Sequence, residues 1–294
     1  MVKAETIRSK REHFNRGQAP IDPQSDLEAL YNNRALVPEH PEIIAGWADR
    51  SADFRRRHQA ASLDLAYGDL AAETLDLFPP LFEGEAEAEP PVLAFLHGGY
   101  WQSLGKDYFS HLAEAACLEG WHVAIIGYPL CPMVSIADIT ESIRRALAFL
   151  WYNMDGPEIH LAGHSAGGHL TVEMLTTDWP AWDGNLPVDL VRSGLSISGI
   201  YDLEPLIQTS LNERLGLTAE TARVLSPIRR KPAYGAPLSL WVGERESEAF
   251  LEQQAQFAQT WAVAEARVVP GANHFSVLEA GIRRLRSTAF HQSP

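Results

Sequence analysis

The sequence predicts an α/β fold in which helices cover both faces of a central, mostly parallel sheet. Between residues 92 and 290, short apolar runs alternate with segments of helical periodicity, and strands that are apolar throughout are typical of parallel sheets buried on both faces. The apolar runs are Val92–Leu96, His122–Ile126, Glu158–Ala162, Gly194–Ile197, Leu238–Val242 and Ala266–Val269. The helical segments lie at about 108–119, 136–151, 168–177, 248–264 and 275–290. Ligands of such sheets bind beyond the carboxyl ends of the strands, so the residues after each run are the candidates for chemistry.

The N-terminal segment and the stretch 206–231 depart from this alternation of strands and helices. Helical spacing at 26–33 and 41–58 predicts a helical segment ahead of the sheet. Thr74–Phe78 then alternates like a strand and ends at a proline pair. The stretch 206–231 interrupts the order of strands and helices, which predicts a small helical cap over the carboxyl edge of the sheet. The expected organisation is a single domain, 1–294, with a helical N-terminal segment, a core and a cap inserted in the core: 1–62, 63–294 and 206–231.

Composition and charge narrow the class of protein. The 294 residues are 46% hydrophobic, which supplies a core for one large domain, and the net charge is -14. Such an acidic chain is not expected to bind nucleic acid or an anionic membrane surface, and no apolar run approaches the roughly 20 residues that cross a bilayer. The two cysteines form no disulfide framework, and residues 1–20 lack the apolar centre of a signal peptide. No metal-ligand cluster, phosphate-binding loop or cofactor motif occurs, so we expect a cytoplasmic protein that uses no metal or cofactor.

The pentapeptide Gly163-His164-Ser165-Ala166-Gly167 lies between an expected strand and an expected helix. A G-x-S-x-G turn in that setting is typical of a nucleophile elbow, where the serine sits on a turn too tight for flanking side chains. The pattern by itself arises by chance in roughly one chain in ten of this composition. The strand before it and the helix after it therefore make Ser165 the candidate nucleophile.

A glycine-rich segment follows the first apolar run of the sheet. It reads His97-Gly98-Gly99-Tyr100-Trp101, and adjacent glycines allow backbone N–H groups to turn toward a substrate oxygen, as in an oxyanion hole. The expected oxyanion donors are the N–H groups of Gly99, Tyr100 and Ala166. An ordinary glycine-rich turn is the alternative interpretation of this segment alone.

A histidine and several carboxylates follow the later strands. His274 comes after the last expected strand, and Glu244 and Glu246 come after the strand before it. Serine, acid and histidine in this chain order are typical of the α/β-hydrolase triad. Ser165 would attack, His274 would take and return its proton, and a carboxylate would orient the imidazole. By position along the chain, Glu246, Glu244 and Asp202 are all candidates for the acid.

These motifs together resemble the kynurenine formamidase (arylformamidase) branch of the α/β-hydrolases, which is related to the hormone-sensitive-lipase-like esterases. The likeness runs from about Tyr31 to Phe275, most of the chain. The segments that carry it are Tyr31-Asn32-Asn33-Arg34, Tyr67-Gly68, Leu75–Phe78, His97–Trp101, Gly163–Gly167, Ser198–Leu203 and His274-Phe275. The resemblance implies that Glu246 is the triad acid, although the family usually has aspartate there, and that Asp202 is not catalytic.

The resemblance also implies an activity. Members of this family remove N-formyl groups from aryl amines, notably N-formylkynurenine, and many also hydrolyse small aryl or short-chain esters. We therefore expect a serine hydrolase that cleaves a small, formyl-type amide of an aryl amine through an acyl-enzyme. A carboxylesterase is the alternative within the same chemistry, and a non-catalytic ligand-binding protein of the same fold is the alternative from another class.

The substrate side of the site is less defined by the sequence. Tyr100 and Trp101 follow the expected oxyanion loop and would suit a flat substrate, with core packing as the alternative. Together with His164 they are the expected substrate-binding residues. The sequence shows no defined clamp for the head group of an amino acid. The expected partner is a small-molecule amide or ester, and a homodimer is an open expectation because many relatives are dimers.

Overall fold

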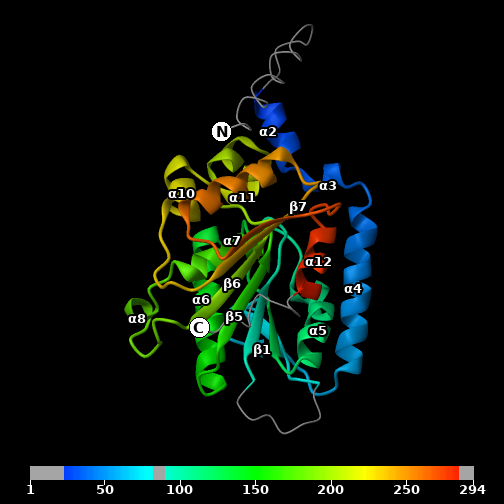
Figure 1. Ribbon diagram of the computed structural model, residues 1–294, viewed down its shortest axis with the longest axis vertical. Helices are drawn as coiled ribbons and strands as arrows, with labels where there is room; N and C mark the ends of the chain where they lie inside the picture. Colours follow the sequence, from blue (N-terminus) through cyan, green and yellow to red (C-terminus); the bar gives the residue numbers. More distant parts are fainter. Residues whose placement is uncertain (1–22, 82–89, 285–294) are drawn as a thin grey trace.

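The computed structural model describes residues 23–81 and 90–284, and its centre is one eight-stranded sheet (Figure 1). The strands are β1 (Ser62–Ala66), β2 (Thr74–Phe78), β3 (Val92–Leu96), β4 (His122–Ile126), β5 (Ile159–His164), β6 (Val191–Ile197), β7 (Leu238–Gly243) and β8 (Glu265–Val269). Their order is β1-β2-β4-β3-β5-β6-β7-β8. The neighbours from β4 to β8 are parallel, whereas β2 is antiparallel to both β1 and β4. This mostly parallel sheet confirms the expected α/β class.

The buried strands lie where the apolar runs predict them. β3 and β4 match their runs at both ends, and β5 to β8 differ by no more than three residues at an end. β1 is not anticipated by the sequence because it is an edge strand with mostly exposed residues, and therefore carries no continuous apolar run. Its pairing with β2 is also irregular, with a register shift around Asp64, whose φ is 56°.

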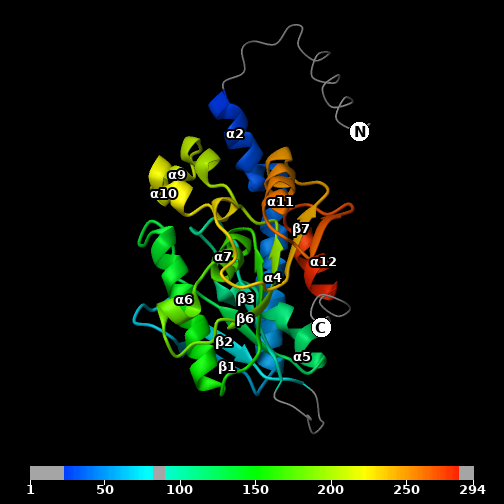
Figure 2. The ribbon, with the colours of Figure 1, turned by 60° about the vertical axis from the view of Figure 1, so that its left-hand side comes forward.

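Helices cover the two faces of the sheet (Figures 1 and 2). One face carries α6 (Ile136–Asn153), α7 (Ala166–Leu175), α8 (Trp179–Trp182) and α11 (Glu248–Thr260), and the other carries α4 (His40–Arg57), α5 (Ala113–Leu118) and α12 (Ser276–Arg284). Strand β3 shows why both layers are needed. Its Val92, Ala94 and Leu96 belong to the core of the first face, and Leu93 and Phe95 belong to the core of the second. A strand whose two faces are both buried cannot show polar alternation.

One expected helix has a different form. The segment at 108–119 begins with two 3-10 turns, η1 (Lys106–Tyr108) and η2 (Ser110–Leu112), ahead of α5. These turns pack against α4, and they place the Lys106 amine 2.6 Å from carboxylates of both Asp64 and Asp76. The ion-pair partners are distant in sequence, so the local spacing of apolar residues does not predict the two 3-10 turns. The last expected helix is α12, described as far as Arg284, so its expected continuation to 290 lies outside the described residues.

Short helices gather over the carboxyl ends of the parallel strands. They are α2 (Pro23–Tyr31) and α3 (Asn33–Leu36) from the N-terminal segment, and η3 (Glu204–Gln208), α9 (Asn212–Leu215), α10 (Ala219–Val224) and η4 (Pro227–Arg229) after β6. Figure 2 shows α2, α9 and α10 at the same end of the molecule, and α2 packs against η3 and α11. The two segments that interrupt the strand–helix alternation therefore meet at the sheet edge where ligands bind.

Three further expectations concern membranes, signal sequences and cysteines. Within the described ranges, no helix combines the length and apolarity that a membrane crossing requires. Residues 1–20, where we expect no signal peptide, are outside the part of the chain that the structure describes. Cys117 and Cys131 are both buried and neither forms a disulfide.

Candidate active site

Ser165 occupies a strained turn between β5 and α7. Its φ and ψ are 55° and -115°, a region that side chains rarely adopt. A Cβ at Gly163 would lie 2.1 Å from the Gly167 carbonyl oxygen, and a Cβ at Gly167 would lie 2.0 Å from the Leu96 carbonyl oxygen. Both glycines are thus required by close backbone approach. Strain that persists at one residue because its surroundings enforce it is typical of a functional site.

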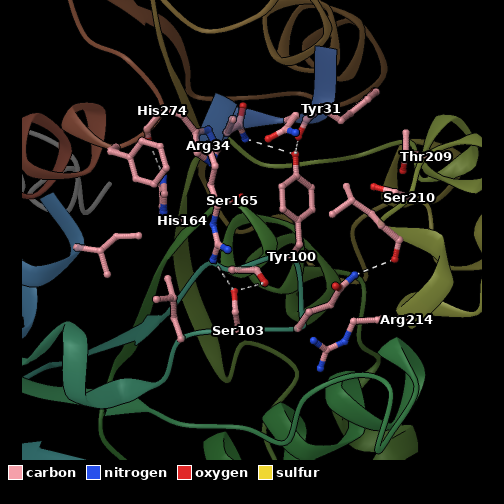
Figure 3. Close-up of a pocket in the computed structure, with 18 of the residues that line it drawn as sticks. Tyr31, Arg34, Tyr100, Ser103, His164, Ser165, Thr209, Ser210, Arg214 and His274 are labelled. Carbon is pink, nitrogen blue, oxygen red and sulfur yellow. Dashed lines mark hydrogen bonds between the residues drawn. The ribbon is translucent and has the colours of Figure 1, made fainter. Parts of the chain in front are cut away.

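The serine opens into a cavity at the carboxyl edge of the sheet (Figure 3). The cavity has a volume of about 230 Å³, and Ser165, His164 and His274 all line it. Ser165 itself is only 2% exposed, so a substrate must enter the cavity to reach it. The other walls come from α2, α3 and α4, from the loop after β3, from Phe275, and from the cap segment between η3 and the end of α9.

His274 is paired with Glu246. Their Nδ1 and Oε2 atoms are 2.6 Å apart, and the two side chains are 5% and 0% exposed. The other carboxylate oxygen, Oε1, accepts hydrogen bonds from the Ser198 hydroxyl at 2.5 Å and from the Gly243 N–H at 2.7 Å. Because both side chains are buried, the low local dielectric strengthens these charge-assisted contacts. The geometry is that of a carboxylate that orients an imidazole.

The other two candidate acids lie elsewhere. Glu244 is exposed, and its Oε2 accepts a hydrogen bond from the Gly271 N–H at 2.8 Å. Asp202 accepts a hydrogen bond from the Glu204 N–H at 3.1 Å and lies 3.9 Å from the Arg229 guanidinium. The structure thus brings only one of the three carboxylates into contact with the imidazole.

The Ser165 hydroxyl and the His274 ring share the cavity without a hydrogen bond between them in the described structure. Contacts of this kind are often loose before substrate binds and tighten in the complex with substrate. The backbone around Ser165 is already held, since its N–H donates to the Ile197 carbonyl at 2.8 Å. A Cβ at Gly98 would lie 3.1 Å from the Ser165 Cβ, so the glycine-rich loop lies directly against the serine.

The three expected oxyanion donors lie around this serine. Ala166 begins α7, where the first N–H groups of a helix have no intrahelical acceptor. Gly99 and Tyr100 have φ values of 117° and 53°, which turn their backbone away from regular strand geometry. Within the described residues, none of these three N–H groups donates a hydrogen bond to another protein atom. These three N–H groups therefore have no protein acceptor among the described residues, and their role as oxyanion donors stays a prediction.

The Tyr100 ring stands in the cavity. Its hydroxyl donates to the Tyr31 carbonyl at 2.5 Å and accepts from the Asn33 amide at 3.3 Å, and Figure 3 shows the ring with Arg34 on one side and Arg214 on the other. Burial raises the pKa of Tyr100 well above its ordinary value, so the hydroxyl stays protonated. This tyrosine lines the cavity, and its contact with a substrate stays a prediction.

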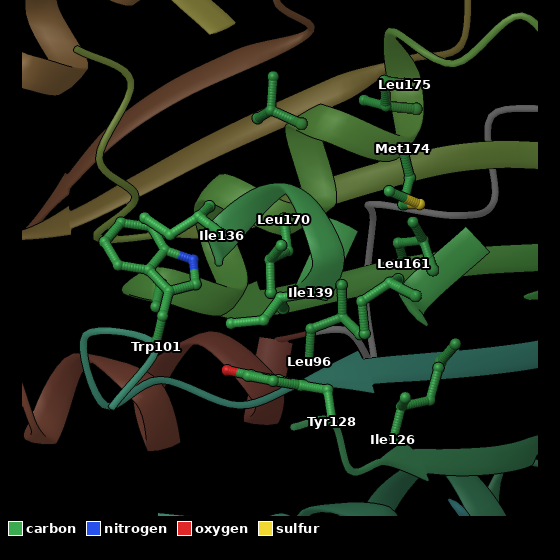
Figure 4. Packing of buried hydrophobic residues seen from close by; sticks show 14 of the residues in the cluster. Leu96, Trp101, Ile126, Tyr128, Ile136, Ile139, Leu161, Leu170, Met174 and Leu175 are labelled. Atoms are coloured by element: carbon green, nitrogen blue, oxygen red, sulfur yellow. The ribbon is translucent and has the colours of Figure 1, made fainter. Parts of the chain in front are cut away.

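Trp101 is in a different place from the one we expect. It is 0% exposed and belongs to the hydrophobic core with Ile136 and Leu170 (Figure 4), and it meets the His169 ring edge-on at 5.0 Å. It does not line the cavity. The left-handed backbone at two successive residues, with φ of 56° at Trp101 itself, turns this side chain inward. The expected substrate contact by Trp101 is therefore wrong, and its role is core packing.

His164 lines the cavity and also supports the histidine of the pair. Its Nε2 lies 2.8 Å from the His274 carbonyl oxygen, and because a carbonyl can only accept, this nitrogen carries the proton. Burial, with the nearby His274 as a smaller cause, lowers the pKa of His164 to about 3. The ring is neutral and holds the loop that presents His274.

Several polar and charged cavity residues have no role in the sequence interpretation. Arg34 and Glu28 come from the N-terminal helices, and Arg214 and Ser210 come from the cap. They are far apart in sequence and follow no motif, although Arg34 lies in one of the segments that carry the family resemblance. Among the described residues, no group of three or more His, Cys, Asp or Glu side chains is arranged to hold a metal ion.

Comparison with known proteins identifies relatives. The sequence profile of the BD-FAE family matches residues 75–202. The kynurenine formamidase of Danio rerio is 30% identical over 229 residues, a match that covers 74% of this chain and 75% of the relative. The kynurenine formamidase of Salmo salar is 28% identical over 230 residues, covering 74% and 76% respectively.

A solved structure is similar over a larger share of the chain. It is a protein of Silicibacter sp. tm1040, provisionally assigned as a thioesterase, with a TM-score of 0.78 and 36% identity over 87% of this chain and 94% of that one. An esterase of Pyrobaculum calidifontis, 16% identical with a TM-score of 0.60 over 92% of this chain and 100% of its own, has the same fold. Both similarities extend over more than four fifths of the chain, so they cover the whole sheet and the turn at Ser165. The chain is therefore an α/β-hydrolase enzyme that belongs to the kynurenine formamidase family.

Proposed function

We propose that this protein is a serine hydrolase that removes a small, formyl-type acyl group from an aryl amine. One observation carries the proposal: His274, paired with the buried Glu246 at 2.6 Å, lines the same cavity as the strained Ser165. Kynurenine formamidases match 74% of this chain, whereas the isoprenylcysteine methylesterases of plants match less than half of it, which favours a formamide over an ester as substrate. A non-catalytic binding protein would have no need of a buried, oriented imidazole beside a strained serine.

In the proposed reaction, the Ser165 hydroxyl attacks the formyl carbon while His274 Nε2 takes the hydroxyl proton. Glu246 orients the imidazole and stabilises its charged form. The oxygen that gains negative charge is bound by the free N–H groups of the oxyanion residues, and each such donor lowers the barrier by about 3–4 kcal/mol. His274 then gives its proton to the amine nitrogen, the C–N bond breaks and a formyl-serine remains. Water, deprotonated by His274, releases formate and regenerates Ser165.

Two arginines support a substrate that carries a carboxylate. Arg34 donates to the Ser103 hydroxyl at 3.2 Å and Arg214 donates to the Cys131 carbonyl at 3.3 Å. Neither guanidinium forms an ion pair with a carboxylate among residues 23–81 and 90–284, although the net charge of the chain is -14. Guanidinium groups left without a carboxylate partner at the mouth of a cavity suit an anionic group of the substrate.

A carboxylate on the same cavity completes the head-group site. Glu28 lines the cavity and accepts hydrogen bonds at 2.7 Å from both the N–H and the hydroxyl of Ser210. These contacts hold an anion where an ammonium group of the substrate could reach it. Together, Glu28, Arg34 and Arg214 would recognise the amino-acid part of an N-formylkynurenine-like molecule, for which the sequence shows no clamp.

Neutralising the arginines should change the choice of substrate. For Arg34→Gln and Arg214→Gln, we expect kcat/KM to fall about tenfold on an N-formyl-aryl amine that carries a carboxylate, mainly through KM, because a charge-assisted hydrogen bond is lost. On neutral N-formylaniline, kcat/KM should stay within about twofold. The matched control is Arg223→Gln, an exposed arginine of α10 outside the cavity, which should change neither substrate. Equal losses on both substrates would contradict the head-group site.

A substrate panel tests the proposed function itself. We expect the wild type to hydrolyse N-formylkynurenine and N-formylaniline faster than p-nitrophenyl acetate after correction for the intrinsic reactivity of each substrate. Preference for the acetate and other short-chain esters would make the protein a carboxylesterase. Inactivity on the whole panel, together with no labelling of Ser165 by a fluorophosphonate, would leave the non-catalytic interpretation.

We also propose the class of molecule that this protein binds and where in the cell it acts. We expect a small-molecule amide or ester to be the physiological partner, and the net charge of -14 disfavours nucleic acid. A cytoplasmic location and a homodimer stay predictions from the composition and from the family resemblance.

A further inference from the structure

Both oxygens of the Glu246 carboxylate accept hydrogen bonds, and only one of them faces the histidine. While Oε2 faces His274, Oε1 receives the Ser198 hydroxyl at 2.5 Å and the Gly243 N–H at 2.7 Å. The side chain of Glu246 is 0% exposed, so water cannot take the place of a lost donor. A buried carboxylate that loses a hydrogen bond keeps the full cost of its desolvation.

The backbone directs the Ser198 hydroxyl to this place. Ser198 follows β6 directly and has a φ of 51°, in the left-handed region that serine seldom adopts. Its N–H donates to the Trp241 carbonyl at 2.7 Å, which joins the end of β6 to β7. The residue is 2% exposed and does not line the cavity. Ser198 therefore cannot act on substrate directly, and its contact with the site is through the carboxylate.

The length of glutamate explains why such a contact is needed. The Glu246 N–H donates to the Gly243 carbonyl at 3.2 Å, and the Gly243 N–H donates back to Oε1. The side chain consequently folds back toward the end of its own strand, which takes up the methylene by which glutamate exceeds aspartate. A longer side chain also has one more rotatable bond, so more conformations must be excluded for it to reach Nδ1 of His274.

We propose that Ser198 is a positioning residue that locks Glu246 in the folded-back conformation that reaches His274. This inference rests on the proposed serine-hydrolase function, because the locked carboxylate matters only if the imidazole works on Ser165. The hydroxyl donates to Oε1, and the Gly243 N–H supplies the second donor, so the carboxylate has one orientation left for His274. Ser198 acts through Glu246 and touches neither substrate nor nucleophile.

Variants at one position separate the hydroxyl from the backbone strain. Ser198→Ala and Ser198→Gly both remove the donor, but glycine also relieves the positive φ. We expect each to lower kcat, and the rate constant for labelling of Ser165 by a fluorophosphonate, by about tenfold to a hundredfold with KM nearly unchanged. Ser193→Ala is the control, because it removes another buried hydroxyl of β6, bonded to His160 at 2.8 Å. It should stay within about twofold.

Two further measurements distinguish positioning from general destabilisation. In a Glu246→Ala background, adding Ser198→Ala should cost less than about twofold, because residues that act as one unit are not additive. The downfield proton resonance of His274 Nδ1–H should shift or broaden in Ser198→Ala and Ser198→Gly and stay in place in Ser193→Ala. Full additivity, or wild-type rates in Ser198→Gly, would overturn the proposal.

The labelling and the resonance also keep this inference apart from the choice of substrate. Fluorophosphonate labelling needs only an activated serine, so it reports on Ser198 even if the wild type hydrolyses neither formamides nor esters. If the wild type is not labelled at all, the serine-hydrolase function fails, and the His274 resonance alone decides whether Ser198 holds the pair. An unchanged resonance in both Ser198 variants would then overturn the positioning role.

Discussion

Replacement of Ser165 by alanine is expected to lower kcat by about 10⁴- to 10⁶-fold on every substrate that the wild type hydrolyses. In the proposed mechanism the hydroxyl oxygen forms the bond of the acyl-enzyme, and among the described serines and threonines that line the cavity, only Ser165 has a positive φ. The His164 and His274 rings stay in place, so the variant loses the nucleophile without losing the pocket. Steady-state kinetics on N-formylkynurenine and p-nitrophenyl acetate, with mass spectrometry after fluorophosphonate treatment, provide the measurement.

The control for this variant is its folding. Alanine at a φ of 55° carries the same backbone strain as serine, so the thermal midpoint of Ser165→Ala should stay close to that of the wild type. Turnover above about one hundredth of the wild-type rate by a folded, homogeneous variant would show that Ser165 is not the nucleophile.

Glu246→Gln is expected to lower kcat by about 10³- to 10⁴-fold, the second largest effect. The contacts of the carboxylate give the reason. The Ser198 hydroxyl and the Gly243 N–H both donate to Oε1, so they select the carbonyl oxygen of the new amide for that position. The amide NH₂ must then face His274 Nδ1 and donate to it. The imidazole proton is driven to Nε2, which can no longer accept the proton of Ser165.

Glu244→Gln is the matched comparison, since it makes the same chemical change two residues away. Glu244 is exposed, and its carboxylate accepts a hydrogen bond from the Gly271 N–H. Its variant should therefore retain kcat within about fivefold. Side-by-side kinetics of the two variants on one substrate decide the assignment. If Glu244→Gln loses activity and Glu246→Gln keeps it, the acid has been misidentified.

The sequence predicts the ends of a strand correctly where nearly every residue of the strand is buried. Strands β3 and β4 are buried on both faces, and their apolar runs mark both ends correctly. Strand β1 lies at the edge with exposed residues and leaves no such mark. The 3-10 turns before α5 begin at Lys106, whose ion-pair partners Asp64 and Asp76 lie on β1 and β2, so no local pattern marks this contact.

The candidate site also has features that the sequence predicts and features that only the fold decides. The chain order of serine, acid and histidine was visible in the sequence, because each residue follows a strand of a parallel sheet, and those strand ends meet at one edge. The choice between Glu244 and Glu246 was not visible from position, because the two lie on one short loop and only its fold decides which one points inward. Trp101 was misplaced for a related reason, since two successive left-handed residues reverse the direction of a side chain.

By itself, the sequence determined the α/β class, the strand–turn–helix setting of Ser165, the place of His274 after the last strand and the family resemblance. Each of these rests on a local pattern that the chain carries wherever it folds. Only the tertiary structure decided that Ser198 and Gly243 donate hydrogen bonds to Glu246 and that Trp101 belongs to the core. It also decided that Arg34 and Arg214 line one cavity. The first relation comes from the neighbouring ends of β6 and β7, and the second from the turn after β3, which packs against α6 and α7. The third comes from the N-terminal helices and the cap, which both line the cavity at the carboxyl edge of the sheet. Each relation depends on segments that are distant in the chain, and no local pattern records such contacts.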